Sequence, residues 1–174
     1  MQVISGIYKN RQLKSPNDSK THPMGSREKL ALFNMLSPYL QNSIVLDAFA
    51  GSGALGIEAL SRGAQKVVFI EKSAKVANTI KENLSNLDRQ AVQNSQIIIQ
   101  DILNFNALEK FDLIIADPPY NLFDPSKIEP LLKFLKPNGI LALSHPGKAP
   151  VFSLLTLQKT HSYAAANISL YQLS

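Results

Sequence analysis

Residues 117–120, Asp-Pro-Pro-Tyr, place a carboxylate, two prolines and an aromatic ring directly after an apolar run at residues 111–116. Proline fixes φ and has no amide hydrogen, so this turn offers hydrogen-bond acceptors and almost no donors. The exocyclic amine of a nucleobase carries two hydrogens, which the Asp117 carboxylate and the Pro118 carbonyl can accept. Tyr120 offers a face for base stacking, worth about 1–3 kcal/mol per base. We therefore expect Asp117, Pro118 and Tyr120 to be catalytic; the alternative is a core strand that ends in a capping aspartate.

Acidic residues also follow three other expected strands. Asp47 precedes a glycine-rich stretch at residues 51–56, and Glu71 and Asp101 each end an apolar run. Ligands of open α/β sheets bind outside the carboxyl ends of the strands, so these acids should line a nucleoside-shaped crevice. Glu71 can reach a ribose diol, and Asp101 with the Ile102 amide can meet an adenine edge. The expected cofactor-binding residues are Asp47, Phe49, Gly51, Gly53, Glu71, Lys72, Asp101 and Ile102.

Two kinds of cofactor are compatible with the glycine-rich stretch. Residues 51–56 match the dinucleotide pattern G-x-G-x-x-G, with Glu71 about 20 residues beyond the first glycine. Asp47, however, would face a pyrophosphate with like charge. S-adenosylmethionine carries an ammonium and a sulfonium, which a carboxylate attracts, so we expect that cofactor. Each of the three acids can also be an ordinary turn or strand-end residue.

The composition limits the other kinds of site. The 174 residues include no cysteine, and the histidines, His22, His145 and His161, are far apart in the sequence. We therefore expect neither a disulfide nor a metal site, and expect the histidines at the surface or in turns. No apolar stretch approaches the ~20 residues of a membrane span, so we expect a cytoplasmic protein without a membrane partner.

The net charge of +5 is concentrated near the N-terminus. Residues 1–36 hold six lysines and arginines against two acids. A basic segment beside a catalytic domain suits a polyanion, because neutralising phosphates releases counterions. A basic arm can also simply be solvated. The residues expected to contact such a polyanion are Lys9, Arg11, Lys14, Arg27 and Lys29.

The N-terminal segment, residues 1–36, is expected to extend a main domain at 37–174. Residues 3–8 and 12–14 read as two short strands, a hairpin too small to fold alone. A polar link at 15–19 follows. A helix is then expected from about Ser26 to Leu36, ahead of Pro38. Its core face should hold Leu30, Phe33 and Leu36.

From Ser43 onward the pattern alternates between strand and helix. Strands are expected at 44–49, 66–70, 96–100, 111–116 and 139–144, and helices at 54–62, 74–87, 103–108 and 126–135. Such alternation predicts parallel strands with helices on both faces of the sheet. Two further strands are expected at 155–163 and 165–173, one of which can run antiparallel.

Four stretches together resemble the bacterial RsmD family. They are residues 6–13, 27–36, 46–64 and 117–120. Members of that family use S-adenosylmethionine to methylate a guanine N2 of 16S ribosomal RNA. The resemblance implies an α/β fold of the class I methyltransferase type, with a Rossmann-like, seven-stranded, mostly parallel sheet and an N-terminal β-hairpin extension. It also implies action on 16S ribosomal RNA within the small subunit or its assembly intermediate, and we expect a monomer.

One stretch departs from the family pattern. The family has Arg-Pro-Thr, basic residues and a glutamate ahead of Ala-Leu-Phe-Asn, whereas this chain has His22 in place of the arginine and Leu30 in place of the glutamate. Arg27 and Lys29 keep the positive charge. The departures bear on the RNA-facing contacts and on the choice of target nucleotide.

Three other functions remain open at this point. A DNA adenine-N6 methyltransferase would bind its target amine with the same turn at residues 117–120. A nicotinamide-dependent oxidoreductase is favoured by the glycine spacing alone. The third is a non-catalytic RNA-binding module that keeps the fold.

Overall fold

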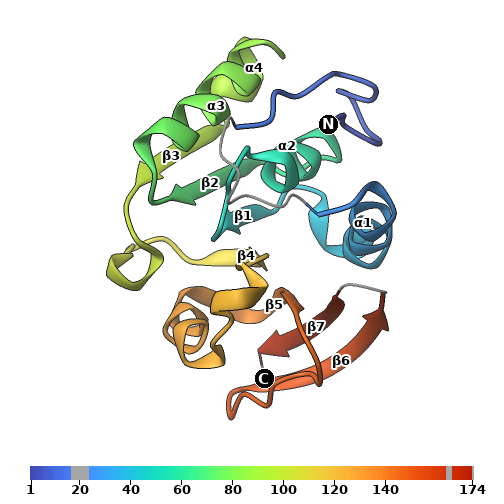
Figure 1. Ribbon diagram of the computed structural model, residues 1–174, viewed down its shortest axis with the longest axis vertical. Coiled ribbons are helices and arrows are strands. Elements are labelled where there is room, and N and C mark those ends of the chain that lie inside the picture. The colour runs from blue at the N-terminus through green and yellow to red at the C-terminus, as the bar shows by residue number, and fades with distance from the viewer. Residues whose placement is uncertain (17–23, 164–165, 174) are drawn as a thin grey trace.

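A seven-stranded sheet forms the centre of the computed structural model, which describes residues 1–16, 24–163 and 166–173 (Figure 1). Its strands are β1 (Ile44–Asp47), β2 (Lys66–Glu71), β3 (Ser95–Ile99), β4 (Phe111–Ala116), β5 (Leu135–His145), β6 (Leu155–Ser162) and β7 (Asn167–Leu173), in the order β3-β2-β1-β4-β5-β7-β6. Strands β1 to β5 pair in parallel, and β7 runs antiparallel to both β5 and β6. The mostly parallel sheet and the antiparallel strand in the terminal pair are therefore confirmed.

Helical segments cover the two faces of this sheet. The α-helices are α1 (Ser26–Leu40), α2 (Ala54–Ser61), α3 (Ala74–Ser85) and α4 (Arg89–Gln93), and the 3-10 helices are η1 (Ile102–Asn104), η2 (Tyr120–Leu122), η3 (Pro125–Lys127) and η4 (Glu129–Phe134). One hydrophobic cluster packs α1, α2 and α3 on the sheet, and a second packs η4 and the region of η1 on the other face. In Figure 1, α1 and the orange segments between β4 and β5 lie on opposite sides of the sheet. Within the described residues, no helix is long and apolar enough to cross a bilayer.

The parallel pairing gathers the acidic residues at one edge of the sheet. The inner residues of β2 are continuously buried, as expected for a strand covered on both faces. Asp47 ends β1 and pairs with Ile115 of β4, two residues before Asp117. Glu71 ends β2 opposite Ile99 of β3. The fold thus places the carboxyl ends of four neighbouring strands beside one another.

Helix α1 differs from its prediction in length and in the face that it buries. It continues to Leu40, with Pro38 inside its last turn. Leu36 and Leu40 lie one turn apart and are both buried, so their packing holds that turn in place despite the proline. Leu30 is 42% exposed, and the buried face instead holds Leu32 and Phe33. The prediction of Leu30 as a core residue is wrong.

Two predicted helices on the other face are reduced to 3-10 turns. The predicted helix at 126–135 becomes η3 and η4, since Pro130 in its interior would lack a donor and clash with the preceding turn. The predicted helix at 103–108 is only η1, because the chain must turn to bury Phe105 against Phe134, whose ring centroid lies 5.0 Å away. Strand β5 accordingly starts at Leu135 rather than at Gly139.

The predicted N-terminal strands are reduced to one antiparallel bridge, between Gln2 and Gln12. The Val3 amide donates to the Arg11 carbonyl at 3.0 Å, so the two arms still lie together. Gly6 and Asn10 have positive φ values of 85° and 68°, which bend the chain away from extended geometry. A hairpin is present, but its strands are not. Most of the predicted polar link at 15–19 lies outside the described residues.

This hairpin rests on α2, as its small size requires. The Glu58 carboxylate accepts from the amides of Ile4 and Ser5 at 2.8 and 3.0 Å. A Cβ at Gly6 would lie 1.7 Å from the Ser61 carbonyl oxygen, so only glycine fits there. Val3, Tyr8 and Leu13 of the hairpin belong to the same hydrophobic cluster as α2. The division between residues 36 and 37 remains a prediction.

Candidate active site

Asp47 is a buried carboxylate at the centre of the acidic edge, only 1% exposed. Its Oδ2 accepts from the Gly56 amide at 2.8 Å, whereas its Oδ1 is buried with no hydrogen-bond partner among the described residues. Burial raises the pKa of Asp47 to about 7, and the charges of Asp117 and Glu71 add to the rise, while the Gly56 bond opposes it. Asp47 Oδ1 could therefore accept from an ammonium or another hydrogen-bond donor of a ligand.

The loop between β1 and α2 brings the predicted glycines against Glu71. Gly51 and Gly53 have φ values of 54° and 80°, a region that side chains disfavour. The Gly51 amide donates to Glu71 Oε2 at 3.0 Å, and the Ser73 amide donates to Oε1 at 2.9 Å. Each carboxylate oxygen has further lone pairs, so Glu71 can still accept from a hydroxyl of a ligand.

The remaining predicted cofactor residues lie around this loop. Asp101 is exposed, and its Oδ1 accepts from the Leu103 amide at 2.9 Å, which caps η1. Ile102 is buried and Lys72 is exposed. Phe49 is half-buried and lines a cavity beside Asp117. The structure thus brings Asp47, Phe49, the glycines and Glu71 together, with Asp101 at the end of the neighbouring strand β3.

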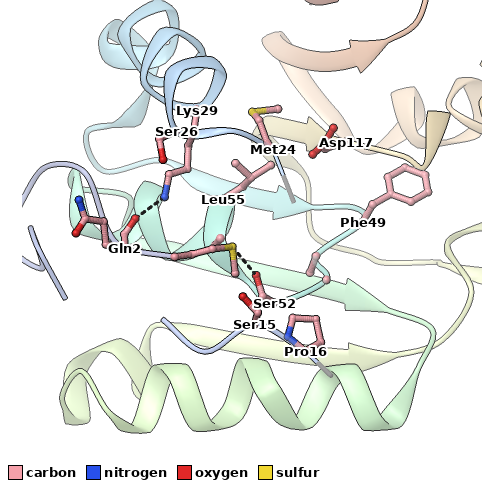
Figure 2. Close-up of a pocket in the computed structure, with 14 residues that line it drawn as sticks. Gln2, Ser15, Pro16, Met24, Ser26, Lys29, Phe49, Ser52, Leu55 and Asp117 are labelled. Atoms are coloured by element: carbon pink, nitrogen blue, oxygen red, sulfur yellow. Dashed lines mark hydrogen bonds between the residues drawn. The ribbon is translucent and has the colours of Figure 1, made fainter. Parts of the chain in front are cut away.

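The cavity at this edge has a volume of about 130 Å³ and is lined by both the glycine loop and the N-terminal segment. Figure 2 shows Asp117 and Phe49 on one side and Gln2 on the other. The Ser52 hydroxyl lies 3.9 Å from the Met1 sulfur. Ligand pockets usually measure ~300–1,000 Å³, so this cavity can hold only part of a nucleoside-sized ligand. Nothing in the sequence analysis indicated that Met1 and Gln2 would line it.

The Asp-Pro-Pro-Tyr turn presents its carboxylate to this cavity. Burial raises the pKa of Asp117 to about 6, although hydrogen bonds from Ser144 and Tyr120 oppose the rise. The Tyr120 and Ser144 hydroxyl oxygens are 2.5 Å apart. Burial and the charge of Asp117 also raise the pKa of Tyr120. The arrangement is a carboxylate and an exposed phenol after the end of β4, with a buried hydroxyl near the end of β5.

Sequence reasoning missed Ser144, which is buried and is the last but one residue of β5. Ala116 pairs with Leu143, so Ser144 comes beside Asp117 at the same edge. A serine near a strand end is common, and only the register between β4 and β5 distinguishes this one. That register could not be derived from the sequence alone.

Four of the five predicted RNA-binding residues are exposed, namely Lys9, Arg11, Lys14 and Arg27. Arg11 donates to the Leu87 carbonyl at 3.0 Å, and Lys14 pairs with Glu82 at 2.9 Å.

Lys29 differs from the other four, because it is only 5% exposed. Its Nζ donates to the Gln2 carbonyl at 2.7 Å and lies 3.4 Å from the Glu58 carboxylate. Burial lowers the pKa of Lys29, and Glu58 opposes this. Lys29 therefore fixes the N-terminal segment and is not available to a phosphate.

The two described histidines, His145 and His161, do not line the cavity. His145 is fully buried in β5, where its Nε2 lies 2.8 Å from the Ser169 hydroxyl, so its predicted surface position is wrong. Burial lowers the pKa of His145. His161 is half-buried, and His22 lies outside the described residues. No group of three or more potential metal ligands occurs within ranges 1–16, 24–163 and 166–173.

Comparisons with known proteins agree with this geometry. The family described as "Conserved hypothetical protein 95" matches residues 1–172. "Ribosomal RNA small subunit methyltransferase D" of Haemophilus influenzae is 36% identical over 99% of this chain and 93% of its own length. The same-named protein of Escherichia coli K12 is 33% identical, over 82% of this chain and 70% of its own.

A solved structure gives the same result for the fold. The chain described as "Putative methyltransferase yhhF from Escherichia coli" superposes with a TM-score of 0.87 and 27% identity, covering 100% of this chain and 98% of that one. The sheet is therefore the Rossmann-like sheet of class I methyltransferases. From its first residues to its last strand, this chain belongs to the RsmD family.

Proposed function

We propose that this protein transfers a methyl group from S-adenosylmethionine to the exocyclic N2 amine of a guanine in 16S ribosomal RNA. The observation that carries the proposal is the Asp117 carboxylate, which lines the cavity beside the glycine loop and has Tyr120 next to it. Relatives named as ribosomal RNA small subunit methyltransferases support the RNA substrate.

The residues at the edge of the sheet fit this cofactor. Asp47 Oδ1 is a buried acceptor without a partner among the described residues, and an ammonium group would satisfy it. When bound, S-adenosylmethionine supplies an electrophilic methyl group on a positively charged sulfur. The residues that would hold it are Asp47, Phe49, Gly51, Gly53, Glu71, Lys72, Asp101 and Ile102. A dinucleotide fits poorly, because Asp47 would face its pyrophosphate with like charge.

The turn at 117–120 would orient the accepting amine. The Asp117 carboxylate and the Pro118 carbonyl accept the two amine hydrogens, which aims the nitrogen lone pair at the methyl group. As the new bond forms, the nitrogen loses a proton, which Asp117 can receive because its pKa is already raised to about 6. Tyr120 stacks on the base. The guanine must be unpaired or turned out of its helix to reach this turn.

The exposed basic residues of the N-terminal segment would hold the RNA backbone. Lys9, Arg11, Lys14 and Arg27 supply the positive charge. We place the reaction in the cytoplasm, with a monomer acting on the small subunit or on its assembly intermediate.

Replacing Asp117 by alanine tests the proposal. We expect methyl transfer to unmodified small subunits to fall by about 10²–10⁴-fold, since the variant loses both the acceptor and the proton-receiving group. Affinity for S-adenosylmethionine should stay largely unchanged. The assay uses labelled cofactor, followed by mapping of the modified nucleotide. The matched control is Asp124→Ala, because Asp124 is exposed and caps η3 away from the cavity.

Three parallel assays separate the alternatives. Transfer to duplex DNA instead of ribosomal subunits would replace the RNA proposal by an adenine-N6 activity. Tight binding of NADH in a fluorescence titration would favour an oxidoreductase. Binding of RNA without any methyl transfer, by wild type and variants alike, would favour a non-catalytic module.

A further inference from the structure

The Ser144 hydroxyl contacts Tyr120 and lies beside Asp117, the groups that the proposed function assigns to the base and to the amine. Ser144 is 2% exposed, and its Oγ lies 2.5 Å from the Tyr120 hydroxyl oxygen. Because Ala116 of β4 pairs with Leu143 of β5, Ser144 also comes beside Asp117, and its hydroxyl lowers the pKa of that carboxyl. A serine hydroxyl donates one hydrogen and accepts others, so Ser144 can serve the carboxylate and the phenol at once.

The sheet holds this hydroxyl in one place. β5 pairs with β4 on one side, where Leu143 is opposite Ala116, and with β7 on the other, where Ser144 is opposite Ile168. A residue between two paired strands has little backbone freedom. Tyr120 itself lies in the single turn η2, which has less support than a strand. Ser144 therefore has the more restricted backbone of the two. A hydrogen bond to Ser144 would restrict the position of Tyr120 in η2.

We propose that Ser144 is a positioning residue for methyl transfer, whose hydroxyl fixes the Tyr120 ring and keeps the Asp117 carboxylate turned toward the amine. This inference rests on the proposed function, because it specifies how the same site is held. Without the Ser144 hydroxyl, the side chains of Tyr120 and Asp117 are still present but no longer have a shared neighbour that positions them. The reaction should then slow, while the cofactor site at Asp47 and Glu71 stays intact.

Several charged groups lie near Ser144, Tyr120 and Asp117, and the variants used in the test should leave them unchanged. Asp47 approaches from β1 with Glu71 of β2 beyond it, and Glu28 of α1 acts on Tyr120. Lys29 lines the same cavity but is bound to Glu58 and the Gln2 carbonyl. The hydroxyls of Ser144 and Tyr120 are the groups that lower the pKa of Asp117 against the effect of burial. Removing Ser144 should therefore raise that pKa further.

The test compares Ser144→Ala with Ser144→Thr, which keeps a hydroxyl at the same atom. For Ser144→Ala we expect kcat for methylation of small subunits to fall about 10- to 100-fold, the loss typical of one hydrogen bond to a charged group. Cofactor affinity should remain that of wild type. The acidic limb of the kcat–pH profile should move to higher pH in Ser144→Ala and return in Ser144→Thr. Ser162→Ala, at an exposed position of β6, is the control for serine removal.

A second measurement does not depend on turnover. The carboxyl carbon of Asp117 can be titrated by NMR in the cofactor-free protein, and Ser144→Ala and Tyr120→Phe should each raise its midpoint. Wild-type kcat and an unshifted Asp117 midpoint in Ser144→Ala would overturn the inference while leaving the proposed function in place. If wild type fails to methylate RNA, the proposed function falls, and the NMR midpoints alone decide whether Ser144 positions Asp117. If Ser144→Ala does not fold, the midpoint in Tyr120→Phe decides, and an unchanged value would overturn the inference.

Discussion

At the scale of single residues, the buried carboxyl of Asp47 lowers the stability of the folded protein at neutral and higher pH. Burial raises the pKa of this carboxyl from 3.8 to about 7. Because the folded protein then binds a proton more readily than the unfolded chain, the stability contributed by this group falls as the pH rises between those two values. It stays low above pH 7. A bound ammonium group reverses this effect, so cofactor binding should release a proton from Asp47 near neutral pH.

Replacing Asp47 by asparagine should separate stability from binding. Asparagine keeps an acceptor for the Gly56 amide but carries no charge, so the cofactor-free variant should gain about 1–3 kcal/mol of unfolding free energy at about pH 8. The gain should be smaller at about pH 5, where the wild-type carboxyl is mostly protonated. Urea unfolding at both pH values measures the difference. Calorimetry should show weakened binding of S-adenosylmethionine, and equal stability gains at the two pH values would contradict the electrostatic explanation.

At the scale of elements, one asparagine of α3 connects the N-terminal segment to the glycine loop. Asn83 is buried, its Oδ1 accepts from the Lys14 amide at 2.8 Å, and its Nδ2 donates to the carbonyls of Lys14 at 3.1 Å and Ser52 at 2.9 Å. Ser52 also lines the cavity. The positions of the N-terminal segment and of the glycine loop therefore both depend on the Asn83 side chain.

Replacing Asn83 by alanine should lower the free energy of unfolding by about 2–4 kcal/mol, because it leaves the Lys14 amide and the Ser52 carbonyl without this partner. Asn78→Ala, at an exposed position of the same helix, should change stability by no more than about 0.5 kcal/mol. Denaturant titration of both variants gives the comparison. Should the two variants prove equally stable, Asn83 would not be the link between segment and loop.

The elements also show where sequence reasoning succeeds. The prediction of β4 at 111–116 is confirmed in full, since its apolar run is bounded by charged residues and by the two prolines. The acids at strand ends were likewise predictable, because parallel strands must end at one edge. The predicted helix at 126–135 failed because one proline outweighed a helical pattern. The burial of Lys29 and the place of Ser144 beside Tyr120 could not be predicted, because their partners are distant in sequence and meet them only in the folded chain.

At the scale of the whole molecule, the charge is divided between two regions with different tasks. The sheet edge collects Asp47, Glu71 and Asp117, whose mutual repulsion favours a cationic cofactor. The N-terminal segment, which covers part of the same cavity through Met1 and Gln2, carries most of the net positive charge. Under the proposed function, an RNA bound by that segment would be delivered to the acidic edge, where its phosphates would be repelled and its neutral bases would not.

This division predicts how RNA binding responds to salt. Each phosphate contact contributes about 0.7 to the slope of log affinity against log salt concentration for single strands. The double variant Lys9→Ala with Arg27→Ala should therefore reduce the slope by about 1.4, whereas cofactor affinity should not change. Lys127→Ala with Lys159→Ala removes the same charge from exposed positions in η3 and β6 and should leave the slope nearly unchanged. Filter binding at several salt concentrations gives both slopes. Equal reductions in the two double variants would mean that net charge, and not the N-terminal segment, holds the RNA.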